Sequence, residues 1–127
     1  MSNVIRYASV YIQNETESIS FYTQYLKFTF CENVKLGVDE EWWILRKDER
    51  AETGIILIKL STKALSKSTL ILHTHDCILA YCRLREAGAT ELSTPLYSSL
   101  GLSFSFYDPN GNKIMLLEER KYNDLEI

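Results

Sequence analysis

The chain has only two histidines, His73 and His75, and their spacing would let them act together. On a strand, residues two apart point to the same side, so both imidazoles could reach one metal ion. A zinc site needs a third or fourth ligand, and no further His, Cys or Glu stands at partner spacing. We interpret His75 as a solvated or hydrogen-bonded residue near the helix cap at Asp76. His73 remains either a wall residue that hydrogen-bonds its surroundings or a group that contacts a ligand and acts as acid or base near neutral pH.

Aromatic residues are the more informative group, since 8 Tyr, 5 Phe and 2 Trp make up 12% of the chain. Tyr7 and Tyr11 are expected on one strand face with Ser9 between them, and the neighbours Trp42 and Trp43 must face opposite ways. An apolar wall with hydroxyl and indole groups suits a planar or partly hydrophobic small molecule. The alternative is that these rings only fill a concave sheet or a dimer seam.

Other chemistries lack their motifs. The chain has no G-x-S-x-G, G-x-G-x-x-G or Walker A sequence. The chain has an odd number of cysteines, Cys31, Cys77 and Cys82, and none of them forms a C-x-x-C motif. We therefore expect free thiols rather than disulfides or a zinc ribbon. Segment 97–101 is interpreted as a flexible connection or cleft rim, and the charged run 47–52 as a solvated hairpin turn.

Composition excludes several classes of partner. The 127 residues are enough for one domain with its own core, and the net charge of −3 is scattered along the chain. Without a basic stripe we expect no nucleic-acid partner. The apolar runs are far shorter than the roughly 20 residues that span a bilayer, so we expect no membrane partner and a cytoplasmic location.

The first half of the chain predicts the order β-α-β-β-β. Segment 4–12 alternates like a half-buried strand, and Asn14 followed by Glu17 can cap a helix of about three turns. Tyr7, Ser9 and Tyr11 share one face of that first strand. Three short apolar segments separated by turns then predict strands at 28–34, 41–46 and 54–60.

The second half repeats this order at an offset of about 61 to 62 residues. Asp76 is a good N-cap for a helix through Ala87, which Gly88 would end in the left-handed conformation. The expected strands are 69–74, 89–92, 102–107 and 113–118, with a tight turn at 108–111. We therefore predict an α+β domain over residues 1–127, with modules at 3–60 and 69–118, a linker at 61–68 and a tail at 119–127.

Both ends of this pattern resemble the glyoxalase/bleomycin-resistance (vicinal oxygen chelate) superfamily. The opening is similar in Tyr-Ala-Ser-Val-Tyr-Ile-Gln-Asn at 7–14, then in Phe-Tyr at 21–22 and Leu-Lys-Phe at 26–28. The closing signature is Phe-Tyr-Asp-Pro-Asn-Gly-Asn-Lys-Ile at 106–114. Trp-Trp-Ile-Leu at 42–45 resembles one bacterial branch of the family. The likeness spans about residues 3 to 119.

The resemblance implies two tandem βαβββ modules whose curved mixed sheets enclose a cleft, usually in a homodimer. One departure is Lys27, where the family typically has a glycine after the first helix. A non-glycine residue in the left-handed region costs about 1 to 2 kcal/mol, so we expect this helix end to be shaped differently.

The same resemblance carries the family's metal-ligand positions onto Tyr7, Thr69, Met115 and either Ile56 or Leu57. None of these side chains is a competent ligand for a catalytic divalent ion. The resemblance therefore implies that no metal or other cofactor is used.

The sequence is compatible with two main functions, and with a third in which the protein binds another protein. The first is a metal-free small-molecule binding protein of the bleomycin-resistance type, a homodimer holding an aromatic or amphipathic ligand in a cleft with His73 as polar anchor. The alternative is a glyoxalase-like lyase, isomerase or dioxygenase with a non-standard metal site or with His73 or Tyr11 as acid or base. The expected cleft residues are Tyr7, Ser9, Tyr11, Trp42, Trp43, Ile56, Thr69, Ile71, His73 and Met115.

Overall fold

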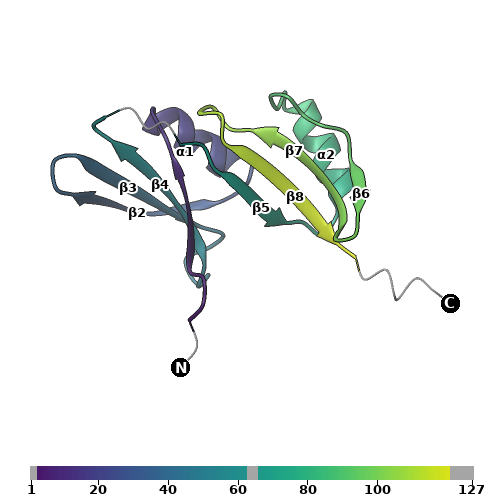
Figure 1. Ribbon diagram of the computed structural model, residues 1–127, viewed down its shortest axis with the longest axis horizontal. Helices are drawn as coiled ribbons and strands as arrows, with labels where there is room; N and C mark the ends of the chain where they lie inside the picture. Colours follow the sequence, from purple (N-terminus) through teal and green to yellow (C-terminus); the bar gives the residue numbers. More distant parts are fainter. Residues whose placement is uncertain (1–2, 63–65, 121–127) are drawn as a thin grey trace. The chain divides into compact units, whose positions relative to one another are not determined.

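The computed structural model describes residues 3–62 and 66–120 as two compact units (Figure 1). Unit 1 comprises Met1–Ser68 with Pro109–Asn112, and unit 2 comprises Thr69–Asp108 with Lys113–Ile127. The predicted tail beyond residue 120 lies outside the described residues, as does the middle of the linker.

Unit 1 has the predicted order β-α-β-β-β. Its sheet has the strand order β1-β4-β3-β2, in which β1 runs parallel to β4 and the other neighbours are antiparallel. The elements are β1 (Tyr7–Tyr11), α1 (Glu15–Gln24), β2 (Thr29–Leu36), β3 (Glu40–Arg46) and β4 (Gly54–Leu60). The first strand is shorter than expected, because Val4 and Ile5 continue the apolar pattern but are 71% and 85% exposed.

The helix α1 packs on one face of this sheet. Asn14 caps the helix as predicted, since its side-chain oxygen accepts a hydrogen bond from the Glu17 amide at 2.9 Å. On β4, Leu57 and Lys59 point to the same side, and the Lys59 ammonium pairs with Glu15 of α1 at 2.8 Å. The buried side chains of this face and of the helix form the core of unit 1: Val10, Phe21, Tyr22, Trp43, Leu45, Ile55 and Leu57.

Unit 2 repeats the arrangement with the strand order β5-β8-β7-β6, and β5 runs parallel to β8. Its elements are β5 (Thr69–His73), α2 (Cys77–Glu86), β6 (Leu96–Ser98), β7 (Gly101–Tyr107) and β8 (Lys113–Glu119). Asp76 caps α2 by accepting a hydrogen bond from the Leu79 amide at 3.0 Å. Tyr81 of α2 meets Phe104 edge to face at 5.6 Å, so Phe104 and its neighbour Phe106 are the side chains of β7 that pack under the helix. The α+β class with two four-stranded mixed sheets is as predicted.

One predicted strand is wrong. Segment 89–92 contributes only an isolated bridge between Thr90 and Tyr107, and Glu91 has a positive φ of 52°, which breaks an extended run. The edge strand is Leu96–Ser98, which overlaps the segment interpreted as a loop. Ser98 pairs with Gly101, so this segment is a tight hairpin. A Cβ on Gly101 would lie 2.1 Å from the Glu118 carbonyl oxygen, which explains the glycine there.

The expectation that Lys27 gives the first helix a differently shaped end is wrong for the backbone conformation, because Lys27 lies in the left-handed region as Gly88 does after α2. The two helix ends differ in their hydrogen bonds. After α1, Lys27 takes the left-handed conformation with φ of 61°, and the Phe28 amide donates to the Tyr22 carbonyl six residues back. After α2, Gly88 has φ of 81°, and the Ala89 amide donates to the Leu84 carbonyl five residues back.

Replacing Lys27 with Gly is therefore expected to raise the free energy of unfolding by about 1 kcal/mol, because it removes left-handed strain from an exposed side chain. The matched change Gly88→Lys places a side chain in the same conformation and should lower the free energy of unfolding by a similar amount. Urea unfolding of both variants checks the pair. Equal stability of Lys27→Gly and the original chain would show that the turn carries no such strain.

All three cysteines are free, as predicted. Cys77 at the start of α2 is fully buried, and burial raises the pKa of its thiol, whereas Cys82 on the same helix is exposed. Reaction with thiol reagents at neutral pH therefore favours Cys82 over Cys77 in the folded protein.

The Glu118 carboxylate ties β8 to the start of α2. It accepts a hydrogen bond from the Cys77 amide at 2.8 Å and pairs with Arg120 at 2.8 Å. The Cys77 hydrogen bond, and then Arg120, hold the pKa of Glu118 below its usual value of 4.5. A depressed pKa contributes stability that is complete above the unfolded pKa and is lost as the pH falls through the folded one.

Acidification below about pH 4.5 is thus expected to lower the melting temperature of the original chain more steeply than that of Glu118→Gln. Thermal unfolding followed by circular dichroism across that range measures the two slopes. Glu119→Gln, the same change at the exposed neighbouring position, is the control and should follow the original chain. Parallel curves for all three proteins would contradict the assigned role of Glu118.

Candidate ligand-binding face

The sheet face of unit 1 opposite α1 collects five of the ten predicted site residues. Cross-strand partners share a face, and the register pairs Ser9 with Ile56, Ile56 with Ile44, and Ile58 with both Tyr11 and Trp42. We call this surface the aromatic face. Its residues on β1, β3 and β4 are Tyr7, Ser9, Tyr11, Trp42, Ile44, Arg46, Ile56 and Ile58.

The aromatic face has an apolar floor and three aromatic rings. Ile44 and Ile56 lie directly opposite each other and are only 8% and 7% exposed, whereas Tyr7, Tyr11 and Trp42 are half-buried. Rings that keep part of their surface accessible beside an aliphatic floor can stack on a planar molecule. The face therefore offers aromatic contact area together with hydroxyl and indole groups.

The structure shows which of the two tryptophans lies on the aromatic face, a choice that alternation along the strand left open. Trp42 lies on the aromatic face and donates its indole N–H to Glu40 at 2.6 Å. Trp43 pairs with Leu57 on the side covered by α1 and is 7% exposed. Of the predicted site residues in unit 1, Trp43 is thus the one that lies on the side covered by α1.

Arg46 is a component of this face that was not predicted from the sequence. Its guanidinium donates to the Tyr7 hydroxyl, and its Cζ lies 5.5 Å from the centre of the Tyr7 ring. The hydrogen bond to Tyr7, with a smaller contribution from Cys31, raises the pKa of Arg46 above its usual value. Cys31 sits at the irregularity in β2 between Phe30 and Glu32. The signal was available, because Trp42, Ile44 and Arg46 alternate along one strand.

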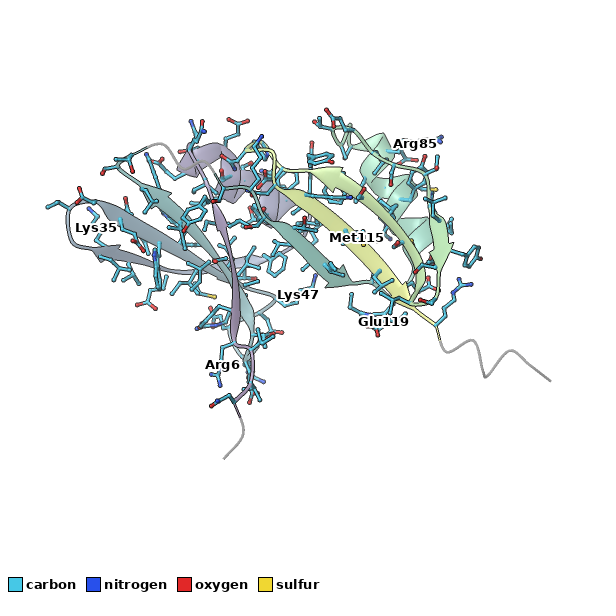
Figure 2. All side chains as sticks on the ribbon, viewed as in Figure 1. Arg6, Lys35, Lys47, Arg85, Met115 and Glu119 are labelled. Atoms are coloured by element: carbon cyan, nitrogen blue, oxygen red, sulfur yellow. The ribbon has the colours of Figure 1, made fainter. Side chains whose placement is uncertain are left out.

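In unit 2 the predicted residues also share one face, the one opposite α2. Thr69, Ile71 and His73 alternate along β5, and Met115 is the register partner of Ile71. Met115 projects from the middle of β8 (Figure 2) and also pairs with Ser105. Ile71 is 60% exposed, so this face keeps accessible apolar surface. The cleft implied by the resemblance stays a prediction, since each unit is described by itself.

The two histidines lie close together, with ring centres 4.8 Å apart and an interplanar angle of 89°. Both are exposed. Within residues 3–62 and 66–120, no group of three or more His, Cys, Asp or Glu side chains could hold a metal ion. An exposed His73 is available to a ligand as a hydrogen-bonding or proton-transferring group.

The residues that the resemblance places at metal-ligand positions do not fit a divalent cation. In unit 1 these are Ile56 or Leu57 and Tyr7, whose hydroxyl is engaged by the positively charged Arg46. In unit 2 they are Thr69 and Met115, a neutral hydroxyl and a thioether. Divalent catalytic ions need imidazole, carboxylate or thiolate donors, so this set of side chains does not support a metal-assisted step.

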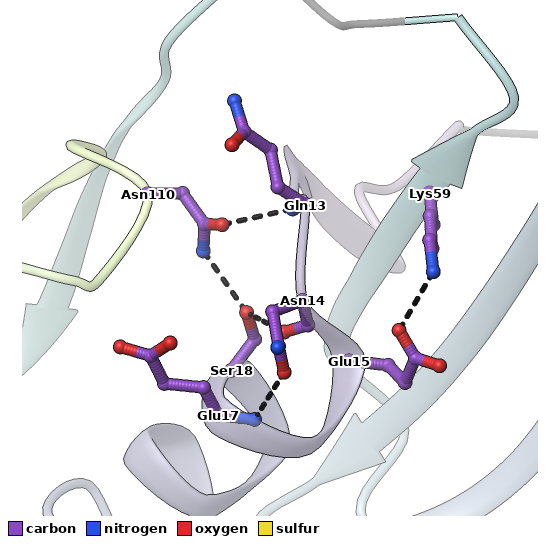
Figure 3. A network of polar contacts seen from close by, with 7 residues as sticks. All are labelled: Gln13, Asn14, Glu15, Glu17, Ser18, Lys59 and Asn110. Carbon is purple, nitrogen blue, oxygen red and sulfur yellow. Dashed lines mark hydrogen bonds and ion pairs between the residues drawn. The ribbon is translucent and has the colours of Figure 1, made fainter.

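The turn predicted at 108–111 has a second role that its sequence did not indicate. The side chain of Asn110 accepts a hydrogen bond from the Gln13 amide at 2.9 Å and donates one to the Ser18 hydroxyl at 3.0 Å (Figure 3). The Ser18 hydroxyl itself donates to the Asn14 carbonyl at 2.7 Å. This network fixes the connection from β1 to α1.

Asn112 holds the end of β1 from the same loop. Its amide group donates to the Tyr11 carbonyl at 3.0 Å and accepts from the Ser68 amide at 2.8 Å, and the residue is 1% exposed. Because Tyr11 supplies one ring of the aromatic face, Asn112 is a positioning residue for that face.

A family model for the Glyoxalase/Bleomycin resistance protein/Dioxygenase superfamily matches residues 4–116. The chain therefore belongs to that superfamily, as the resemblance predicted. None of the curated proteins compared with the chain matches it significantly. Among the residues that the structure describes, no helix is long and apolar enough to cross a membrane.

Solved structures share the fold. TnmS3, an antibiotic binding protein from Streptomyces sp. CB03234, is 24% identical, with a TM-score of 0.79 over 94% of this chain and 98% of its own. A glyoxalase/bleomycin resistance protein from the same organism is 25% identical, with a TM-score of 0.72 over 91% of this chain and 100% of its own. The trypanothione-dependent glyoxalase I of Leishmania major is 17% identical, with a TM-score of 0.75 over 98% of this chain and 92% of its own.

Proposed function

We propose that this protein is a metal-free small-molecule binding protein of the bleomycin-resistance type, which holds an aromatic or amphipathic ligand. The observation that carries the proposal is the aromatic face, where half-buried rings of Tyr7, Tyr11 and Trp42 accompany the buried floor of Ile44 and Ile56. Aromatic side chains left accessible beside apolar surface are typical of small-molecule sites.

The comparison with TnmS3 supports a binding role. That protein is described as antibiotic binding, and it shares the fold over nearly the whole chain. We extend only this type of function to the chain, which would sequester or carry a small molecule without converting it. The misfit of Tyr7, Ile56, Thr69 and Met115 to a divalent ion supports binding rather than metal-assisted chemistry.

A fluorescence titration tests the proposal with phenylnaphthylamine, a neutral aromatic dye that brightens when it leaves water. We expect saturable binding at a single site per chain, with the dye protected from a soluble quencher. Metal analysis of protein purified without an affinity tag accompanies the titration. Absence of saturable binding, or stoichiometric tightly bound Zn, Ni, Mn or Fe, would contradict the proposal.

An enzyme is the second candidate, favoured by one observation. His73 is exposed on the uncovered face of unit 2, where an imidazole could transfer a proton without a metal. Such a lyase or isomerase would use His73 or Tyr11 as acid or base. Turnover of a bound compound that His73→Ala abolishes, with binding retained, would favour this candidate over simple binding.

We also infer a homodimer working in the cytoplasm. Ile71 and Leu96, which are 60% and 68% exposed, lie on the uncovered face of the unit 2 sheet, and a second copy would cover such apolar surface. Three free thiols suit a reducing compartment. Sedimentation velocity at micromolar concentration should give a dimer, and a monomer would refute this inference.

A further inference from the structure

Arg46 carries a positive charge that no carboxylate neutralises in the described part of the chain. The ion pairs there are Lys59 with Glu15 and Arg120 with Glu118. Arg46 is half-buried, and its partners are a phenol and a thiol. Arginine side chains are mostly exposed in folded proteins, so a half-buried guanidinium without a carboxylate partner on a candidate binding face favours an anion from outside the protein.

The neutral partners hold the guanidinium in a fixed position. Arg46 reaches Tyr7 across β4, since both residues are register partners of Gly54 on the strand between them. A Cβ at position 54 would lie 2.3 Å from the Leu45 carbonyl oxygen and 3.0 Å from the Arg46 Cγ. The glycine therefore leaves the space in which the Arg46 side chain crosses the sheet.

This arrangement leaves donors for a ligand. A guanidinium has several N–H donors in a planar fork, and the Tyr7 hydroxyl accepts from only one of its nitrogens. Such a fork matches the two oxygens of a carboxylate or sulfonate. Because the Tyr7 hydroxyl restricts the side chain, less conformational freedom is lost when an anion binds.

The position of Arg46 relative to the rings limits the shape of the ligand. Trp42, Ile44 and Arg46 alternate along β3, and a strand rises about 3.3 Å per residue. The guanidinium thus originates roughly 7 Å from the Ile44 position and about 13 Å from the Trp42 position along the strand. An extended aromatic molecule lying over the isoleucine floor could place one end at Arg46.

We propose that Arg46 is the anion-recognising residue of the aromatic face, and that the ligand is a planar aromatic molecule carrying an anionic group such as a carboxylate, sulfonate or phenolate. This inference rests on the proposed function and adds the chemical class of the ligand. Tyr7 acts with Arg46 as the residue that orients the guanidinium.

Two related dyes test the proposal. Anilinonaphthalene sulfonate carries the anionic group, and phenylnaphthylamine has the same aromatic skeleton without it. Arg46→Gln is expected to weaken binding of the sulfonate dye about ten- to a hundred-fold, the range for losing a charge-assisted hydrogen bond. Binding of the neutral dye should change less than about twofold. Arg50→Gln, an equal charge change in the exposed turn after β3, is the matched control and should leave both affinities unchanged.

The outcomes separate the two proposals. If Arg46→Gln weakens the binding of both dyes equally, or of neither dye, Arg46 does not recognise the anion. That result overturns the inference and leaves the proposed binding function in place. If neither dye binds the original chain saturably, the proposed function fails and the inference with it. Arg46→Lys keeps the charge without the fork, so it should retain part of the sulfonate affinity lost in Arg46→Gln.

Discussion

Replacing Asn112 with Ala is expected to lower the free energy of unfolding by about 3 kcal/mol, although the side chain is polar and lies in a turn. The change removes a hydrogen bond to the Tyr11 carbonyl and another from the Ser68 amide, which a buried side chain makes to two partly buried backbone groups. An unsatisfied buried donor or acceptor costs about 1 to 3 kcal/mol. Urea unfolding followed by tryptophan fluorescence measures the difference.

Asn110→Ala is the matched control for this prediction. It removes two similar hydrogen bonds in the same loop, but Asn110 is only half-buried and water can replace part of what is lost. We expect a loss of about 1 kcal/mol. Comparable losses for the two variants would show that burial of Asn112 is not what makes its hydrogen bonds important. Asn112→Ala should also weaken dye binding, because it releases the strand end that carries Tyr11.

Removing the Trp42 ring is the second large change, and it acts on binding rather than on stability. Trp42→Ala is expected to weaken phenylnaphthylamine binding about ten- to a hundred-fold, since stacking and burial of one indole contribute about 1.5 to 3 kcal/mol. Because the ring is only half-buried, its removal should lower the free energy of unfolding by no more than about 1 kcal/mol. Titration of the dye, with unfolding measured in parallel, gives both quantities.

Two aromatic positions in the same sheet provide the controls for Trp42. Phe30 pairs with Leu45 on the opposite side of the sheet and is 46% exposed. The variant Phe30→Ala should therefore bind the dye with an affinity within about twofold of that of the original chain. Trp43→Ala should instead destabilise the fold by about 3 to 5 kcal/mol, because it opens a cavity under α1. Equal loss of dye binding in Trp42→Ala and Phe30→Ala would mean that the dye binds aromatic surface without preference for the aromatic face.

The parts of the fold that depend on neighbouring residues could be predicted from sequence. Asn14 and Asp76 cap their helices through hydrogen bonds to amides three residues away, which is a local relation. Segments 4–6 and 96–98 differ from what their local sequence favours. Val4 and Ile5 favour a strand but lie outside β1, whereas Leu96–Ser98 forms an edge strand although its three residues are exposed and show no apolar alternation.

The site was only partly predictable for the same reason. Alternation correctly placed Tyr7 and Tyr11 on one face, but the choice between Trp42 and Trp43 depended on which side α1 covers. The Arg46 contact with Tyr7 depends on the register of three strands around Gly54. The hydrogen bond from Asn112 to Tyr11 joins residues 101 positions apart, and no sequence spacing indicates it.

If the aromatic face binds the ligand, the two tryptophan indoles report on the binding directly. In a nitrogen-15 correlation spectrum titrated with phenylnaphthylamine, we expect the indole resonance of Trp42 to shift together with the amides of Tyr11, Ile44 and Ile56. The resonance of Trp43, on the covered side of the same sheet, should stay in place. An unmoved Trp42 resonance, or shifts confined to the exposed surface of α2, would contradict binding at the aromatic face.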